Sequence, residues 1–147
     1  MKLEFMREAL KEAQKAFNEN EVPIGAVIVK DNKIIAKAHN TRNKSKVATN
    51  HAEILAIIKA CKKLKDWRLE NSDIYVTLEP CPMCAGAIAN ARIKNCYFGA
   101  FDKTSKQDFS KLIFEDERLN HKVNFEGGLL EEDCATLLTT FFSQKRK

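Results

Sequence analysis

A hairpin pattern near the N-terminus places the strongest constraint on the fold of this chain. Two apolar runs, Gly25–Lys30 and Lys33–Ala38, flank the dipeptide Asp31-Asn32. Two strand-like runs around a short polar turn are typical of a β-hairpin, so these runs are predicted to pair as antiparallel strands. The elements that follow then decide what kind of sheet the hairpin joins.

Helices and strands are predicted to alternate after the hairpin. Helical periodicity covers residues 2–18, 51–64, 80–91 and 131–142, strand patterns cover 74–78, 95–99 and 123–125, and 106–118 is typical of a loop with a helix. A hairpin followed by such alternation implies a mixed sheet with helices on both faces. We therefore predict an α/β fold that forms one domain over residues 1–147, with its site where strands meet helices.

The composition is that of an ordinary globular protein. The chain has 147 residues, of which 44% are hydrophobic and 31% charged, and it contains no run long enough to span a bilayer. Its first residues mix both charges and lack the apolar core of a signal peptide, so we expect a cytoplasmic protein with no membrane contact. The net charge of +5 favours polyanionic partners only weakly. The tail Gln144–Lys147 could contact phosphate or could simply favour solubility.

The cysteines fall into two groups. Cys61, Cys96 and Cys134 are scattered singly, and in a reducing compartment we expect them in the core as small hydrophobic residues. Cys81 and Cys84 instead have a spacing that metal sites and redox sites use.

A zinc site is predicted from Cys81, Cys84 and His51. Residues three apart on a helix share a face, so both sulfurs can reach one atom. Pro82 suits the first helical position, which places Cys81 at the helix N-terminus, where thiolates are favoured. Two thiolates and one imidazole leave a fourth position for water, which is the pattern of catalytic zinc.

Glu53 lies two residues after His51 and is a candidate for carrying a proton from water to a leaving amine. Taken alone, the cysteine pair could be redox-active, structural or accidental, and His51-Ala52-Glu53 could be an ordinary helix surface. A thioredoxin-like role would need the cysteine pair after the first strand and would leave His51 and Glu53 unexplained. Together the two segments match the signature of zinc-dependent nucleobase deaminases, which indicates that the chain is an enzyme of this class.

Longer segments resemble the bacterial tRNA-specific adenosine deaminases, which belong to the cytidine deaminase-like superfamily. The resemblance covers nearly the whole chain, and its most specific part is the cysteine segment. The matching segments are 22–27, His39-Asn40, 51–54, 77–88, 91–93, 98–102, 119–123 and 137–142. This resemblance implies a three-layer α/β/α fold around a mixed five-stranded sheet, a homodimer, and conversion of adenosine to inosine at the wobble position of a tRNA anticodon loop, with release of ammonia.

The resemblance also implies roles for individual residues. His51, Cys81 and Cys84 would hold one Zn²⁺ per subunit, with Glu53 as the proton carrier. Asn40 would contact the flipped nucleotide, the Ala52 backbone N–H would read its base edge, and Asp102 would touch the ribose of a flanking nucleotide. The terminal pair Phe141 and Phe142 would lie near the RNA.

Three of these assignments have structural alternatives. Asn40 could be a turn residue, and Asp102 could cap the next helix. Phe141 and Phe142 could pack in the core. We take His39 and His121 as structural or surface residues.

Two departures from the family pattern leave the substrate open. Val47-Ala48-Thr49-Asn50 replaces the usual Asp-Pro-Thr before His51, and 103–110 contains none of the glycines usual there. Glycine permits close backbone approach and positive φ, so their loss bears on the surface facing the substrate. A deaminase of a free base or nucleoside, such as guanine or cytosine, is the alternative function. A catalytically silent RNA-binding module is a third, which the presence of Glu53 disfavours.

Overall fold

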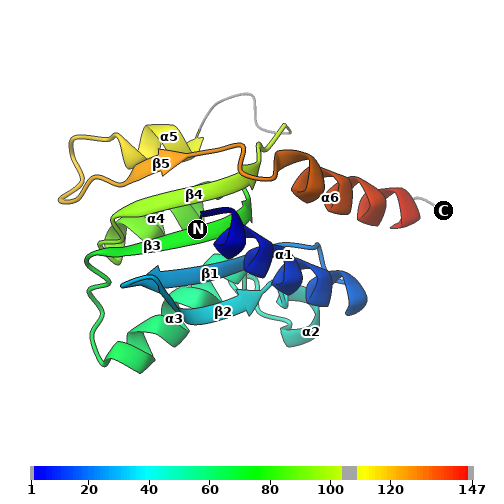
Figure 1. Ribbon diagram of the computed structural model, residues 1–147, viewed down its shortest axis with the longest axis horizontal. Coiled ribbons are helices and arrows are strands. Elements are labelled where there is room, and N and C mark those ends of the chain that lie inside the picture. The colour runs from blue at the N-terminus through cyan, green and yellow to red at the C-terminus, as the bar shows by residue number, and fades with distance from the viewer. Residues whose placement is uncertain (1, 104–108, 146–147) are drawn as a thin grey trace.

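A mixed five-stranded sheet with helices on both faces forms the protein, as Figure 1 shows for the computed structural model. The structure describes residues 2–103 and 109–145. In chain order the elements are α1 (Lys2–Asn18), β1 (Gly25–Lys30), β2 (Lys33–His39), α2 (Arg42–Ser45), α3 (Ala52–Leu64), β3 (Ser72–Leu78), α4 (Pro82–Asn90), β4 (Asn95–Ala100), α5 (Phe109–Phe114), β5 (Asn124–Glu126) and α6 (Glu131–Lys145). The predicted three-layer α/β/α class is therefore confirmed.

The sheet has the order β2-β1-β3-β4-β5. Strand β1 pairs antiparallel with both β2 and β3, whereas β3, β4 and β5 run parallel. At the predicted hairpin turn, Asp31 and Asn32 have φ values of 53° and 60°, the left-handed backbone that matches the twist of a two-residue hairpin. The parallel half of the sheet gives β3 and β4 carboxyl ends at the same edge, where the site is built.

Alternation along the strands divides the apolar residues between two cores. Ile28, Ile74 and Val76 pack on one face with small residues of α3 and α4. Val27 and Tyr75 point to the other face, where they meet α1 and α6. Helix α1 approaches β1 closely because Gly25 has no side chain, since a Cβ there would collide with the backbone of Ala9 and Ala13.

Some details differ from the sequence-based expectations. The polar segment 40–50 contains the short helix α2, which has no buried residue and hence no apolar pattern to reveal it. Cys96 and Cys134 are buried as predicted, but Cys61 is only half-buried, with its thiol directed to the Trp67 carbonyl oxygen. The segment 106–118, which was predicted to form a loop with a helix, contains α5.

Part of two predicted features lies outside the described residues. These are positions 104–108 of the glycine-free run and the last two residues of the basic tail. Within the described part of the chain, no helix has both the length and the apolar character needed to cross a membrane.

Candidate metal centre

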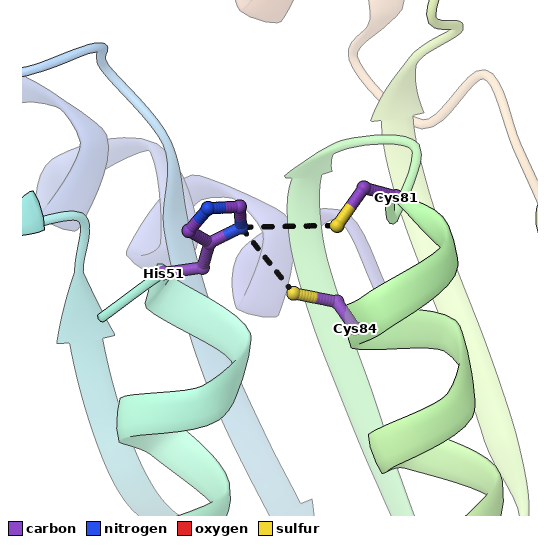
Figure 2. Close-up of side chains that lie close together, drawn as sticks. All are labelled: His51, Cys81 and Cys84. Carbon is purple, nitrogen blue, oxygen red and sulfur yellow. Dashed lines mark hydrogen bonds between the residues drawn. The ribbon is translucent and has the colours of Figure 1, made fainter. Parts of the chain in front are cut away.

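His51, Cys81 and Cys84 come together between two helix N-termini, as Figure 2 shows. The Nδ1 atom of His51 lies 3.8 Å from the Cys81 sulfur and 3.5 Å from the Cys84 sulfur. One donor atom from each residue falls within 4.8 Å of the others. Residues 30 positions apart are thus brought to the distance at which they can share one ion.

Local sequence explains why these side chains converge. His51 is the extended residue before α3, and Cys81 is the extended residue before α4, with Pro82 in the first turn. Proline at this position fixes the start of a helix without losing a hydrogen bond, because the first N–H groups have no intrahelical acceptor. Cys84 then lies one turn into α4, on the face of Cys81. These placements are those predicted from the sequence.

The pKa values of the two thiols are shifted in opposite directions. The hydrogen bond from Cys84, together with that from His51, lowers the pKa of Cys81 to about 4. The interaction with Cys81, together with burial, raises the pKa of Cys84. The hydrogen bond to Cys81 raises the pKa of His51. The lowered pKa favours the thiolate form of Cys81, which is the form that binds a metal.

Glu53 is buried beside these ligands, with 4% of its surface exposed. Burial raises the pKa of its carboxyl group to about 7. Among the described residues, its Oε1 atom is the buried side-chain oxygen or nitrogen without a hydrogen-bond partner. A buried polar atom without a partner is costly, so its presence indicates a group that binds there.

The donor set fits a zinc ion with an open coordination position. Imidazole and thiolate are ligands that zinc prefers, and three protein ligands are typical of catalytic sites. In the described part of the chain, His51, Cys81 and Cys84 are the one such group of potential ligands. His39 and His121 lie elsewhere: His39 contacts Glu12 and Glu19, and the His121 ring contacts the Ile93 carbonyl oxygen. Both have structural partners, in agreement with the prediction.

Of the residues expected to bind substrate, Ala52 lies next to His51, and Asp102 lines a cavity with Cys81. Ala52 is the first residue of α3 and is buried next to His51. Asn40 forms a turn, since its Oδ1 accepts from the Arg42 N–H at 3.0 Å and its Nδ2 donates to the Val22 carbonyl at 3.2 Å. The alternative turn role of Asn40 is thus present, and its contact with a substrate stays a prediction.

Asp102 follows β4 and lines a small cavity together with Cys81. Helix α5 is described from Phe109 onward, directly after residues that lie outside the described part of the chain. The capping role and the nucleotide-binding role of Asp102 therefore both stay predictions.

A larger, mainly apolar hollow of about 380 Å³ extends from Asp102 to α6. It is lined by Val22, Leu78, Ala100, Phe101, Asp102, Lys103, Glu131, Ala135, Leu138, Thr139 and Phe142. Phe141 is 5% exposed and packs edge-on against Phe17, whereas Phe142 is 45% exposed. The core-packing alternative therefore holds for the first phenylalanine of the pair, and the second lines the hollow.

Two further buried carboxylates, Glu21 and Glu79, received no role from the sequence. Glu21 accepts hydrogen bonds from the backbone N–H groups of Asn43 and Lys44 at 3.0 and 2.7 Å. Glu79 contacts Asp102 and Ser110. The available signal was an acidic residue between apolar neighbours, at Leu78-Glu79-Pro80, two residues before the first cysteine.

Comparison with known proteins agrees with this geometry. The family model of the MafB19-like deaminases matches residues 1–146. The tRNA-specific adenosine deaminase of Bacillus subtilis is 48% identical over 144 residues, which are 97% of this chain and 89% of the relative. The corresponding protein of Aquifex aeolicus is 46% identical, over 97% of this chain and 94% of its own.

Solved structures show the same fold. A structure from a study of A-to-I editing by tRNA:A34 deaminases superposes with a TM-score of 0.86 and 43% identity, covering 92% of this chain and 99% of its own. A guanine deaminase from Nitrosomonas europaea has a TM-score of 0.80 at 19% identity, over 95% and 83% of the two chains, and shares the fold alone. The chain therefore belongs to the family of tRNA-specific adenosine deaminases.

Proposed function

We propose that this protein is a zinc-dependent hydrolytic deaminase that converts adenosine to inosine at the wobble position of a tRNA anticodon loop. The observation that carries the proposal is the buried Glu53 carboxyl group, whose Oε1 atom has no hydrogen-bond partner, beside the His51, Cys81 and Cys84 ligand set. The relatives named for this activity match the chain over nearly its full length.

His51, Cys81 and Cys84 would hold the zinc ion, which supplies the Lewis acid that makes water a nucleophile at neutral pH. Glu53 then moves the protons. Its carboxylate accepts a proton from the attacking water and donates it to the exocyclic amine, so that the new bond is C6–O and the broken bond is C6–N. A raised pKa suits this role because the group must both take up and release a proton near neutrality.

Recognition of the nucleotide would come from the residues around the centre. The Ala52 N–H, at the free amino end of α3, is available to a base edge, and Asn40 and Asp102 lie on the segments that follow β2 and β4. Phe142 offers an exposed ring in the hollow beside Asp102. A base in an anticodon loop can leave its stack at low cost, which allows C6 to reach a recessed centre.

Deamination of a free base is the second candidate. The glycine-free run 103–110 favours it, because the sequence of this run departs from the pattern of the tRNA-editing enzymes. The metal centre would be used unchanged, and only the substrate would differ.

One assay separates the two candidates. Zinc-loaded protein is incubated with an anticodon stem-loop RNA, and in parallel with adenosine, guanine and cytosine, and both inosine and ammonia are measured. Inosine formed in the stem-loop alone, and lost in Glu53→Ala with zinc retained, is the expected result. Activity confined to a free base would overturn the tRNA assignment while keeping the metal mechanism.

We further propose a homodimer formed through α4 and α5, acting as a single-domain enzyme in the cytoplasm, where its substrate is found. Met83 on α4, Phe109 and Leu112 on α5, and Leu119 after it expose large apolar surface, which is typical of an association surface. Light scattering should give twice the chain mass, and Leu112→Asp should shift the protein to monomer. A wild-type monomer would contradict this assignment.

A further inference from the structure

The side chain of Glu79 links the metal-binding turn to the segment that carries Asp102. Its Oε1 atom accepts from the Asp102 backbone N–H at 3.0 Å, and its Oε2 atom accepts from the Ser110 hydroxyl at 2.7 Å. The side chain is 9% exposed, and Ser110 is buried as well. One carboxylate oxygen of Glu79 thus binds Asp102, just after β4, and the other binds Ser110, in α5.

The sheet explains why Glu79 can reach this segment. Strands β3 and β4 are parallel, with Leu78 opposite Ala100, and the Glu79 N–H donates to the Ala100 carbonyl at 2.9 Å. Cys81 lies three residues after the end of β3, and Asp102 lies two residues after the end of the neighbouring β4. Glu79 belongs to the turn that carries Cys81, and its carboxylate binds the segment that carries Asp102.

The hydrogen bond to the Glu79 carboxylate holds the backbone N–H of Asp102 in place. A hydrogen bond from the Asp102 N–H to a buried carboxylate is charge-assisted and stronger than a neutral one. Its loss would leave the N–H without that acceptor and free the Asp102 backbone to shift. Because a displacement of about 1 Å strongly impairs a positioned contact, Glu79 controls what the Asp102 side chain can touch.

We propose that Glu79 is a positioning residue. It holds Asp102 in place relative to the metal centre and so determines how tightly the protein binds the nucleotide that flanks the target. The inference rests on the proposed function. Glu79 itself touches neither the metal ligands nor the reacting atoms in this account. Its removal should weaken binding of the RNA rather than the chemical step.

Two variants distinguish the effect of the Glu79 hydrogen bonds from the effect of its negative charge. Glu79→Ala removes both acceptors, and KM for the stem-loop should rise roughly tenfold while kcat changes less than about threefold. Glu79→Gln should restore KM to near the wild-type value. Its amide oxygen can accept from the Asp102 N–H and its amide N–H can donate to the Ser110 hydroxyl, which serves either as donor or as acceptor.

A matched pair of serines controls for stability. Ser110→Ala removes the hydroxyl that donates to Glu79, and Ser72→Ala removes a buried hydroxyl that donates to the Leu69 carbonyl, at the other end of β3. Both changes cost one buried hydrogen bond, so both should lower the melting temperature. Only Ser110→Ala should raise KM, by roughly threefold.

The decisive test combines the protein variants with modified RNA. Single 2′-deoxy substitutions at the nucleotides flanking the target remove the hydroxyl that Asp102 is proposed to contact. At one of these positions the substitution should raise KM for wild type and for Ser72→Ala roughly tenfold, but should have little further effect in Glu79→Ala or Asp102→Ala. Zinc content, measured by mass spectrometry, should be equal in all variants.

The outcomes are distinct. If Glu79→Ala keeps the wild-type KM and the full response to the deoxy substitution, the positioning role is wrong and Glu79 only stabilises the fold. If Glu79→Ala does not fold, Ser110→Ala against Ser72→Ala gives the same decision. If the wild type forms no inosine in the stem-loop, the proposed function fails instead.

Discussion

The metal centre and the surface around it are built in different ways. His51 and Cys81 are fixed at the first turns of two helices that pack on the sheet, and Cys84 and Glu53 are buried within those turns. Asn40, Asp102 and Phe142 lie instead in a loop turn, after a strand end and on an exposed helix face. Under the proposed function, the chemical step would thus depend on residues held by helices packed on the sheet, and recognition on residues of turns and of an exposed helix face.

This difference predicts that changes in the two regions will have separate effects. A change at the centre should abolish reaction with every substrate, because the same groups act on any bound base. A change at the surrounding residues should alter binding of the RNA and leave the chemical step in place. The following experiments test that separation.

The largest effect is expected from Cys84→Ser. A hydroxyl is a poor zinc ligand at neutral pH, so the variant should lose its metal and with it more than about 10⁴-fold of activity. Zinc content and inosine formation are measured on the same sample. Full zinc occupancy together with wild-type activity would contradict the assigned ligand set.

Glu53→Gln should cost about 10³-fold in kcat, since general acid–base groups contribute roughly 10²–10⁴-fold. The amide has the size of the carboxylate but cannot carry the proton. Zinc content and KM should stay close to wild type, which distinguishes this change from ligand loss. A kcat within tenfold of wild type would remove Glu53 from the mechanism.

The buried carboxyl group of Glu53 should also make the free energy of unfolding of metal-free protein depend on pH. Burial raises the pKa of Glu53 from 4.5 to about 7 in the folded state. The folded protein therefore loses stability as the pH rises through this window, because the charged form must be buried. Glu53→Gln does not titrate, so its free energy of unfolding should equal that of wild type near pH 4 and exceed it by about 3 kcal/mol above pH 7. A difference that does not change with pH would exclude a raised pKa.

Phe142→Ala and Phe141→Ala form a contrast on one helix. Phe142 is exposed in the hollow, and stacking on a base is worth about 1–3 kcal/mol, so KM for the stem-loop should rise roughly tenfold without loss of stability. Phe141 is buried, and its truncation should destabilise the fold by about 3 kcal/mol. Equal effects of the two changes on KM would argue against a base-stacking role.

Asn40→Ser should give the smallest effect. The shorter hydroxyl can still accept from the Arg42 N–H and keep the turn, but it should no longer reach a nucleotide. KM should rise roughly threefold, as expected for one lost hydrogen bond, and the melting temperature should fall slightly because the bond from Nδ2 to the Val22 carbonyl is also lost. A lowered melting temperature with an unchanged KM would show that Asn40 acts through the turn alone.

The sequence predicts the centre better than its surroundings for a physical reason. The positions of Cys81, Pro82 and Cys84 follow from helix geometry, and the hairpin follows from the backbone preferences of Asp31 and Asn32. Such rules act within a few residues. The bridge from Glu79 to Asp102 and Ser110 depends on the pairing of parallel strands, and no local pattern encodes it. Helix α2 was missed because it buries no residue, and therefore has no apolar period.

The most direct test of the account is zinc titration of metal-free protein with the anticodon stem-loop in ¹⁸O-labelled water. Inosine formation should rise in proportion to added zinc, reach its maximum at one ion per chain, and place one labelled oxygen in each inosine. Activity that is independent of zinc, or inosine without the label, would contradict a hydrolytic metal centre at His51, Cys81 and Cys84.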